Sequence, residues 1–195
     1  QVKWEVGLLY GIESKVLRGG IDDSQINREK VSNPSNIKSP ARIVTISRLE
    51  SKKRIDLLIR GFELSQSDGR LIIIGDGPER ANLEKLASSC CKRNSIYFLG
   101  RVSDSERIAE LSLADCFCYL DVGDFGITVV EAMAIGIRCI VTEDFDLKAL
   151  GKDVSGIVSI KANEKKLSEL LSDLPSIERS NKSNLKVLAS LTWQH

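Results

Sequence analysis

The residues best suited to chemistry lie in one stretch, DVGDFGITVVEAMAIG at positions 121–136. Apolar runs that are typical of buried strands precede it at 116–120 and follow it at 139–141. Between these runs the sequence predicts a polar turn that contains glycine, and then a helix that Gly136 ends. The first amides of a helix have no intrahelical acceptor, so the start of this helix is a predicted anion site.

Two residues of this stretch could contact a ligand directly. Gly126 lets the backbone approach a ligand closely, because no side chain stands in the way. Glu131 is the one carboxylate on the otherwise apolar predicted helix, and such a carboxylate requires a partner. A ligand hydroxyl would be a suitable partner, and a nearby basic residue would be another.

A second loop carries cationic side chains that could complement an anion. Arg48 follows an apolar run, and Lys53 comes five residues later, near the expected start of the next helix. Arginine offers a planar fork to two phosphate oxygens and lysine offers a compact charge, so the two could converge on one anion. The alternative is a solvated basic helix start, which is the usual setting of a Lys-Lys-Arg run.

Two more loops follow apolar runs and are less informative. Residues 75–80 read Gly-Asp-Gly-Pro-Glu-Arg, in which Pro78 suits the first turn of a helix. The two glycines, Gly75 and Gly77, are weak evidence for a nucleotide site, and they also fit an ordinary turn.

The loop after the following run contains Arg101 and Val102. The bare sequence indicates only the end of a strand and a helix cap there, at Ser103 or Asp104. No nucleobase preference can be deduced from these residues.

The elements that position these loops alternate between apolar runs and amphipathic segments. We expect strands at 43–46, 71–74, 96–99, 116–120, 139–141 and 157–160. The last of the intervening helices is expected to carry Leu167, Leu170, Leu171 and Leu174 and to end at Pro175. This alternation predicts an α/β fold with a doubly wound, Rossmann-like parallel sheet. In such sheets ligands bind beyond the carboxyl ends of the strands, where the strand order reverses.

The composition of the 195 residues excludes several classes of function. A net charge of +1 gives no electrostatic case for nucleic acid, and no apolar run is long enough to span a bilayer. The five cysteines are expected to be reduced core thiols of a cytoplasmic protein. A single histidine, His195, makes a zinc site or a histidine-dependent triad implausible. Because Gln1 is not an initiator methionine, the start of the chain is expected to be cut.

On these residues the chain resembles the large family 4, or group 1, of retaining, nucleotide-sugar-dependent glycosyltransferases with the GT-B fold. The family pattern has two glutamates eight positions apart, Phe-Gly between them, and Glu-Ala-Met-Ala-x-Gly at its end. This chain matches from Asp124 to Gly136 and departs at the first glutamate, whose place Gly123 holds.

The resemblance implies the C-terminal, donor-binding domain of a GT-B enzyme. It implies a hexosyltransferase that takes a sugar from a UDP- or GDP-linked donor with retention and without a metal or other cofactor. Arg48 and Lys53 would hold the diphosphate, and Glu131 would accept hydrogen bonds from the ribose. The other donor contacts that the resemblance implies come from Gly75, Gly77, Arg101, Val102, Phe125, Gly126, Ile127 and Thr128.

The resemblance also divides the chain and leaves its activity open. It implies an acceptor-domain remnant and hinge at 1–20, a linker at 21–40, the donor domain at 41–175 and a terminal helix at 176–195. An N-terminal helix of a single domain is the alternative for the first part. A glycan or lipid-linked acceptor would bind the missing N-terminal domain, with peripheral association at a membrane, and the fragment alone would not turn over.

Gly123 cannot make the sugar contact of the lost glutamate. Asp124, which we take as a catalytic candidate with Glu131, or Asp121 could replace it, or the contact comes from elsewhere. Otherwise the protein is a non-catalytic GT-B partner or pseudoenzyme. A GT-B sugar-nucleotide epimerase or phosphorylase is a further alternative.

Overall fold

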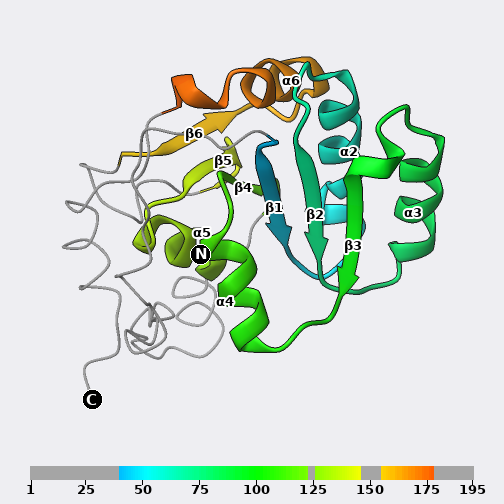
Figure 1. The fold of residues 1–195 in the computed structure, drawn as a ribbon, viewed down its shortest axis with the longest axis horizontal. Coiled ribbons are helices and arrows are strands. Elements are labelled where there is room, and N and C mark those ends of the chain that lie inside the picture. Colours follow the sequence, from blue (N-terminus) through cyan, green and yellow to red (C-terminus); the bar gives the residue numbers. More distant parts are fainter. Residues whose placement is uncertain (1–39, 123–125, 146–154, 178–195) are drawn as a thin grey trace, which may run out of the picture.

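One parallel sheet organises the part of the chain that the computed structural model describes, residues 40–122, 126–145 and 155–177 (Figure 1). The strand order is β3-β2-β1-β4-β5-β6, and each neighbouring pair is parallel. The strands are β1 (Arg42–Ile46), β2 (Arg70–Ile74), β3 (Ile96–Gly100), β4 (Cys116–Tyr119), β5 (Arg138–Thr142) and β6 (Ile157–Ile160). The predicted doubly wound parallel sheet is therefore confirmed.

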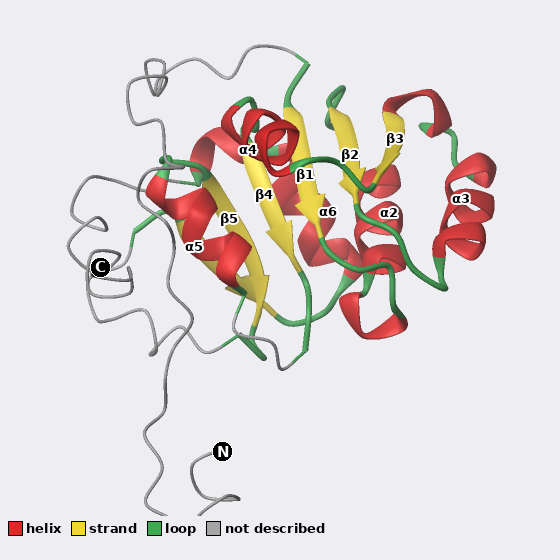
Figure 2. Cartoon of the chain, turned by 90° about the horizontal axis from the view of Figure 1, so that it is seen from below, coloured by secondary structure: helices red, strands yellow, loops and turns green. Residues whose placement is uncertain are grey.

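Helices cover both faces of this sheet. They are α2 (Ile55–Leu64), α3 (Arg80–Ser89), α4 (Asp104–Ser112), α5 (Ile127–Ala134) and α6 (Glu164–Ser172). Short 3₁₀ turns lie at Ser51–Lys53, Arg93–Ser95 and Leu174–Ser176. Figure 2 shows α4 and α5 on one side of the sheet and α2 and α6 on the other, as expected for strands buried on both faces.

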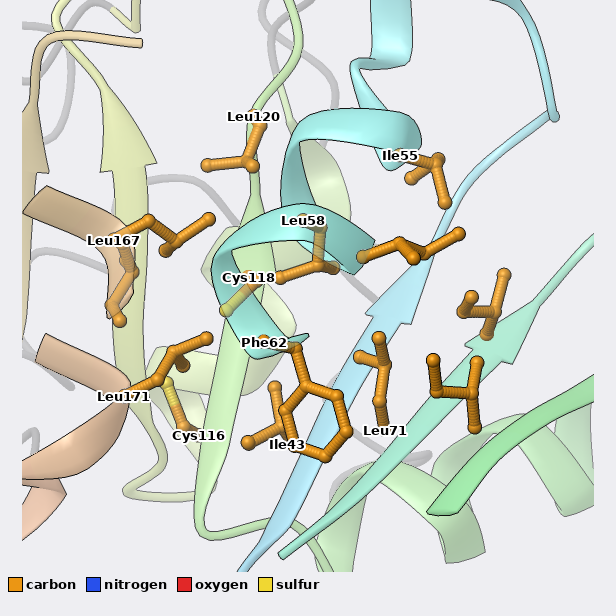
Figure 3. Close-up of a cluster of buried hydrophobic side chains, with 14 of the residues drawn as sticks. Ile43, Ile55, Leu58, Phe62, Leu71, Cys116, Cys118, Leu120, Leu167 and Leu171 are labelled. Carbon is orange, nitrogen blue, oxygen red and sulfur yellow. The ribbon is translucent and has the colours of Figure 1, made fainter. Parts of the chain in front are cut away.

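Two apolar clusters hold these layers together. On the α2 and α6 side, Phe62 is fully buried against Ile43 and Leu71, and cysteines of β4 complete the layer (Figure 3). On the opposite side, α5 packs Val130 and Met133 against alternate residues of β4 and β5. Successive strand residues point to opposite faces, so each central strand contributes to both clusters.

The strand order reverses between β1 and β4. The chain moves outward from β1 to β2 and β3, and then α4 carries it back across the sheet to β4, on the other side of β1. The loop after β1 and the loop after β4 therefore leave neighbouring strands at the same carboxyl edge. This is the position at which open α/β sheets bind their ligands.

Three expectations from the sequence were wrong in detail. Pro78 lies in a turn before α3 rather than in its first turn, because the amide of Glu79 donates to the carbonyl oxygen of Leu49 at 3.0 Å. Helix α6 ends at Ser172, and Leu174 is buried from a separate 3₁₀ turn that contains the proline. Cys91 is exposed rather than part of the core, although the other four cysteines are buried. The expected elements at 1–39 and 178–195 lie outside the described residues.

Candidate functional site

The start of α5 depends on Gly126. This residue has φ +67°, in the left-handed region that favours glycine, and its carbonyl accepts the amide of Val129 at 2.8 Å. A Cβ there would come within 2.6 Å of the Phe145 ring and 3.2 Å of the Tyr119 ring. The backbone therefore lies directly on these two rings, which meet edge to face at 5.9 Å between centroids. The amides of Ile127 and Thr128 open the helix at its positive end.

Lys53 lies beneath the same aromatic surface. It belongs to the 3₁₀ turn before α2, is 8% exposed, and pairs with the buried carboxylate of Asp121 just beyond β4. Its ammonium nitrogen is 6.0 Å from the centroid of the Tyr119 ring. Gly126 packs on that ring as well, so Lys53 and the start of α5 have Tyr119 as a common neighbour.

Asp121 is the fixed member of this pair. Its Oδ2 accepts the Tyr119 hydroxyl at 3.0 Å, and its Oδ1 accepts the amide of Val122 at 2.7 Å. Its carbonyl oxygen accepts the hydroxyl of Thr142 on β5 at 3.1 Å. Because these hydrogen bonds hold Asp121 in place independently of Lys53, the aspartate determines where the lysine side chain points.

Arg48 does not share this buried setting. Its side chain is 69% exposed, and its Nε lies 3.1 Å from Glu50 on the same loop. The neighbouring Arg54, in the left-handed conformation (φ 51°), instead reaches across the carboxyl edge to Asp144 at 3.0 Å. Two basic residues of the first loop, Lys53 and Arg54, are therefore tied to the loops after β4 and β5, whereas the described contact of Arg48 is local.

Glu131 has a basic neighbour that sequence reasoning did not identify. Arg107, on α4, donates from Nη1 to Glu131 Oε2, and the side chains are only 17% and 15% exposed. Burial by itself would lower the pKa of Arg107, but the hydrogen bond and charge of Glu131 raise it. Of the two partners that the sequence allowed for Glu131, a basic residue is present.

The glycines of the second loop serve close packing between loops. Leu49 donates to the carbonyl of Asp76 at 3.0 Å, and the Gly75 amide donates to the carbonyl of Gly100 at 2.7 Å. A Cβ on Gly75 or Gly77 would collide with the backbone of the loop after β1. These glycines therefore hold the loops after β1, β2 and β3 in one layer.

The remaining predicted site residues are less informative. Arg101 is exposed, and Val102 packs partly against the α5 side of the sheet. Asp124 and Phe125 lie outside the described residues, as does Gly123. In the described ranges, no group of three or more histidine, cysteine or acidic residues could hold a metal ion, and no helix has the length and apolarity to cross a membrane.

Comparison with known proteins gives the family. The family model described as glycosyl transferases group 1 matches residues 27–186. A GDP-mannose-dependent monoacylated alpha-(1-6)-phosphatidylinositol monomannoside mannosyltransferase of Corynebacterium glutamicum is 31% identical over 139 residues, which is 66% of this chain and 36% of that protein. Alpha-monoglucosyldiacylglycerol synthase of Acholeplasma laidlawii is 30% identical over 132 residues, 66% of this chain and 33% of the relative. The chain thus spans about a third of the length of these relatives.

Solved structures share the fold. Anabaena HepE, crystallised with UDP and glucose, superposes with a TM-score of 0.68 at 19% identity over 92% of this chain and 51% of its own. The lipopolysaccharide outer core galactosyltransferase WaaB gives a TM-score of 0.72 at 16% identity over 96% of this chain and 55% of its own. Both are GT-B glycosyltransferases, and the described sheet has the Rossmann-like fold of one of their domains. By its family match over most of its length, this chain belongs to the group 1 glycosyltransferases.

Proposed function

We propose that this chain is the donor-binding half of a hexosyltransferase that moves a sugar from a nucleoside diphosphate sugar to an acceptor. The observation that carries the proposal is that Lys53 and the start of α5 lie near the same side chain, the Tyr119 ring, at the reversal of strand order. Relatives named as GDP-mannose-dependent, and a similar structure solved with UDP-glucose, support a nucleotide-linked donor. A UDP- or GDP-linked sugar is the proposed donor class.

The diphosphate would lie between the helix start and the lysine. The amides of Gly126, Ile127 and Thr128 would face the distal phosphate, and Lys53 and Arg48 would supply positive charge. Charge develops on the departing diphosphate as the glycosidic bond breaks, so these groups would stabilise the transition state as well as the ground state. By its resemblance to the family, we also propose metal-independent transfer with retention.

Glu131 would accept hydrogen bonds from the ribose. Among the described residues only its Oε2 is engaged, by Arg107, so the contact with Arg107 and a contact with ribose through Oε1 are compatible. Gly75, Gly77, Arg101 and Val102 lie on loops at the same edge of the sheet, and we keep them as donor-side residues with Phe125.

The sugar contact normally made by the first glutamate is assigned to Asp124. Asp121 is 2% exposed and already accepts several hydrogen bonds, so it is a poor replacement. The second candidate, a non-catalytic GT-B partner, rests on Gly123 in place of that glutamate. If Asp124→Ala lowers the transfer activity of the whole protein as much as Glu131→Ala does, the result supports an enzyme. If Asp124→Ala leaves that activity unchanged, the sugar contact does not belong to Asp124.

The acceptor would bind outside this chain. The names of two relatives include phosphatidylinositol and diacylglycerol, so we propose a glycan or lipid-linked acceptor, bound by the other domain of a cytoplasmic protein at a membrane surface. The isolated 195 residues would then bind nucleotide without transferring sugar, and measurable transfer by them would contradict this.

Calorimetric titration with UDP, GDP and the corresponding nucleosides tests the donor site. Lys53→Ala should weaken nucleoside diphosphate binding by about tenfold to a hundredfold, the range of a charge-assisted hydrogen bond, and leave nucleoside binding within about twofold. Because Lys53→Ala strands a buried carboxylate, Lys53→Met with Asp121→Asn is the second variant. Equal weakening of diphosphate and nucleoside binding would contradict the phosphate role.

A further inference from the structure

Arg107 joins two elements that the donor would contact separately. It lies in the first turns of α4, and its guanidinium reaches Glu131 on α5, 24 residues away along the chain. Its Nε also lies 3.3 Å from Oδ1 of Asp104, whose side chain is 82% exposed. The guanidinium therefore bridges two carboxylates, one at the start of α4 and the largely buried one of Glu131 on α5.

The start of α4 is itself held rigidly. Ser103 caps the helix by accepting the amide of Glu106, and the Glu106 side chain accepts the amide of Ser103 at 2.8 Å in a capping box. The capped turn directly follows Arg101 and Val102, which we keep as donor-side residues. Arg107 extends from this capped turn, and its hydrogen bond to Oε2 favours the Glu131 rotamer that makes it.

Glu131 also stands at a suitable spacing from the phosphate end. Ile127 opens α5, and four residues later, at about 1.5 Å per residue, Glu131 lies about 6 Å further along the helix axis. That is about one helical turn, and a ribose is separated from its terminal phosphate by a similar length. The carboxylate can thus face a ribose while the amides face phosphate, provided that it keeps one orientation.

We propose that Arg107 is a positioning residue for the nucleoside half of the donor. It holds Glu131 through Oε2, so that Oε1 is aimed at the ribose hydroxyls and the start of α4 is tied to α5. This inference rests on the proposed donor site, and it adds a residue whose effect should be confined to ribose recognition.

The test compares a nucleotide with its ribose-deficient analogue. Calorimetry measures binding of UDP or GDP, whichever binds more tightly, and of its 2′,3′-dideoxy form to the chain and to Arg107→Met. The unaltered chain should prefer the ribo form by about tenfold or more, as hydrogen bonds to a carboxylate imply. Arg107→Met should reduce this preference to less than about threefold, and Arg107→Lys should restore part of it. Inorganic pyrophosphate binding should stay within about twofold, because no phosphate contact changes.

A matched control exists on the same helix. Arg42 pairs with Glu110 on α4, both side chains 24% exposed, at the opposite edge of the sheet. Arg42→Met should weaken the anchoring of α4 yet leave the preference for ribose unchanged. In the double variant Arg107→Met, Glu131→Gln, the preference should equal that of Glu131→Gln alone, because the arginine acts through the carboxylate.

Each contrary outcome overturns the inference. An unchanged preference in folded Arg107→Met, or an equal loss in Arg42→Met, would mean that Arg107 only stabilises the fold. If Arg107→Met fails to fold, the Arg107→Lys preference decides: a preference equal to that of the unaltered chain overturns the inference, and a reduced one supports it. Tight binding of nucleoside diphosphate without any preference for ribose overturns this inference and leaves the phosphate site standing. No binding of either nucleotide removes the proposed function, and this inference falls with it.

Discussion

Lys53 and Asp121 form a buried ion pair, so removing both charges should cost no more than removing one. The lysine side chain is 9% exposed and the aspartate side chain 1%. Lys53→Met leaves the carboxylate buried without its counter-charge, although Tyr119 and Val122 still donate to it. Single removal from a buried pair costs about 3–5 kcal/mol, and these remaining donors favour the lower end, about 3 kcal/mol.

The reverse change is expected to be similar in size. Asp121→Asn leaves the Lys53 ammonium buried, so it should also lower the free energy of unfolding by about 3 kcal/mol. The double variant buries neither charge, and neutral replacement of a buried pair is often tolerated, so its cost should be no more than about 3 kcal/mol. The coupling energy between the two sites, which is the sum of the single losses minus the double loss, is then at least about 3 kcal/mol.

Urea unfolding followed by far-ultraviolet circular dichroism measures all four proteins of this cycle. A suitable control pair is Lys166 with Glu169 on α6, 3.3 Å apart with side chains 57% and 52% exposed. That exposed pair should couple by less than about 0.5 kcal/mol, and only its coupling should fade at high salt. If the two single losses in the Lys53 cycle sum to the loss of the double variant within about 0.5 kcal/mol, the reasoning is refuted, because such additivity is the behaviour of independent sites.

Two further changes test the packing beneath the site and the buried thiols. Gly126→Ala should cost about 2–4 kcal/mol in urea unfolding, since a left-handed alanine costs about 1–2 kcal/mol and the Phe145 ring must also move. Gly100→Ala, with φ +70° but only the flexible Arg80 side chain nearby, should cost about 1–2 kcal/mol, and an equal loss for both would contradict the crowding at Phe145. Burial raises the pKa of Cys90 from 9.0 to about 11, so iodoacetamide at pH 9 should alkylate exposed Cys91 in the folded chain and spare Cys90. Because the folded pKa is the higher one, the stabilisation from the Cys90 thiol is complete below pH 9 and is lost as the pH rises toward 11; mass spectrometry that finds early modification of Cys90 would contradict this.

Apolar runs were sufficient to predict the sheet because its central strands, β1, β2, β4 and β5, are largely buried on both faces. The apolar run Leu71–Ile74 predicted a buried strand, and β2 is buried along that run. The sequence predicted only that ligands bind where the strand order reverses, and the structure places that reversal between β1 and β4. Leu174 was placed wrongly because helical spacing extends past Ser172, and a buried 3₁₀ turn satisfies the same apolar pattern.

Side-chain pairs across the sheet left no comparable pattern in the sequence. Lys53 and Asp121 are 68 residues apart, and Arg107 and Glu131 are 24 apart, so neither pairing has a period or a local spacing that could reveal it. Only the fold brings them together, because β4 lies beside β1 and α4 beside α5. The apolar setting of Glu131 did indicate that some partner was required, and the choice between a ligand and a basic residue needed the structure.

The two pairs have a common consequence for how the site could recognise a donor. In each pair a charged residue that we expect to touch the ligand is held by an oppositely charged one: Asp121 holds Lys53, and Arg107 holds Glu131. A lysine or glutamate ordered only on binding would lose side-chain entropy at that moment, about 1.5–2 kcal/mol for each. Here each side chain is already paired in the folded chain, so the proposed diphosphate and ribose would meet groups that are preorganised. The same reasoning gives the buried aspartate a purpose that its sequence position, two residues before Gly123, did not suggest.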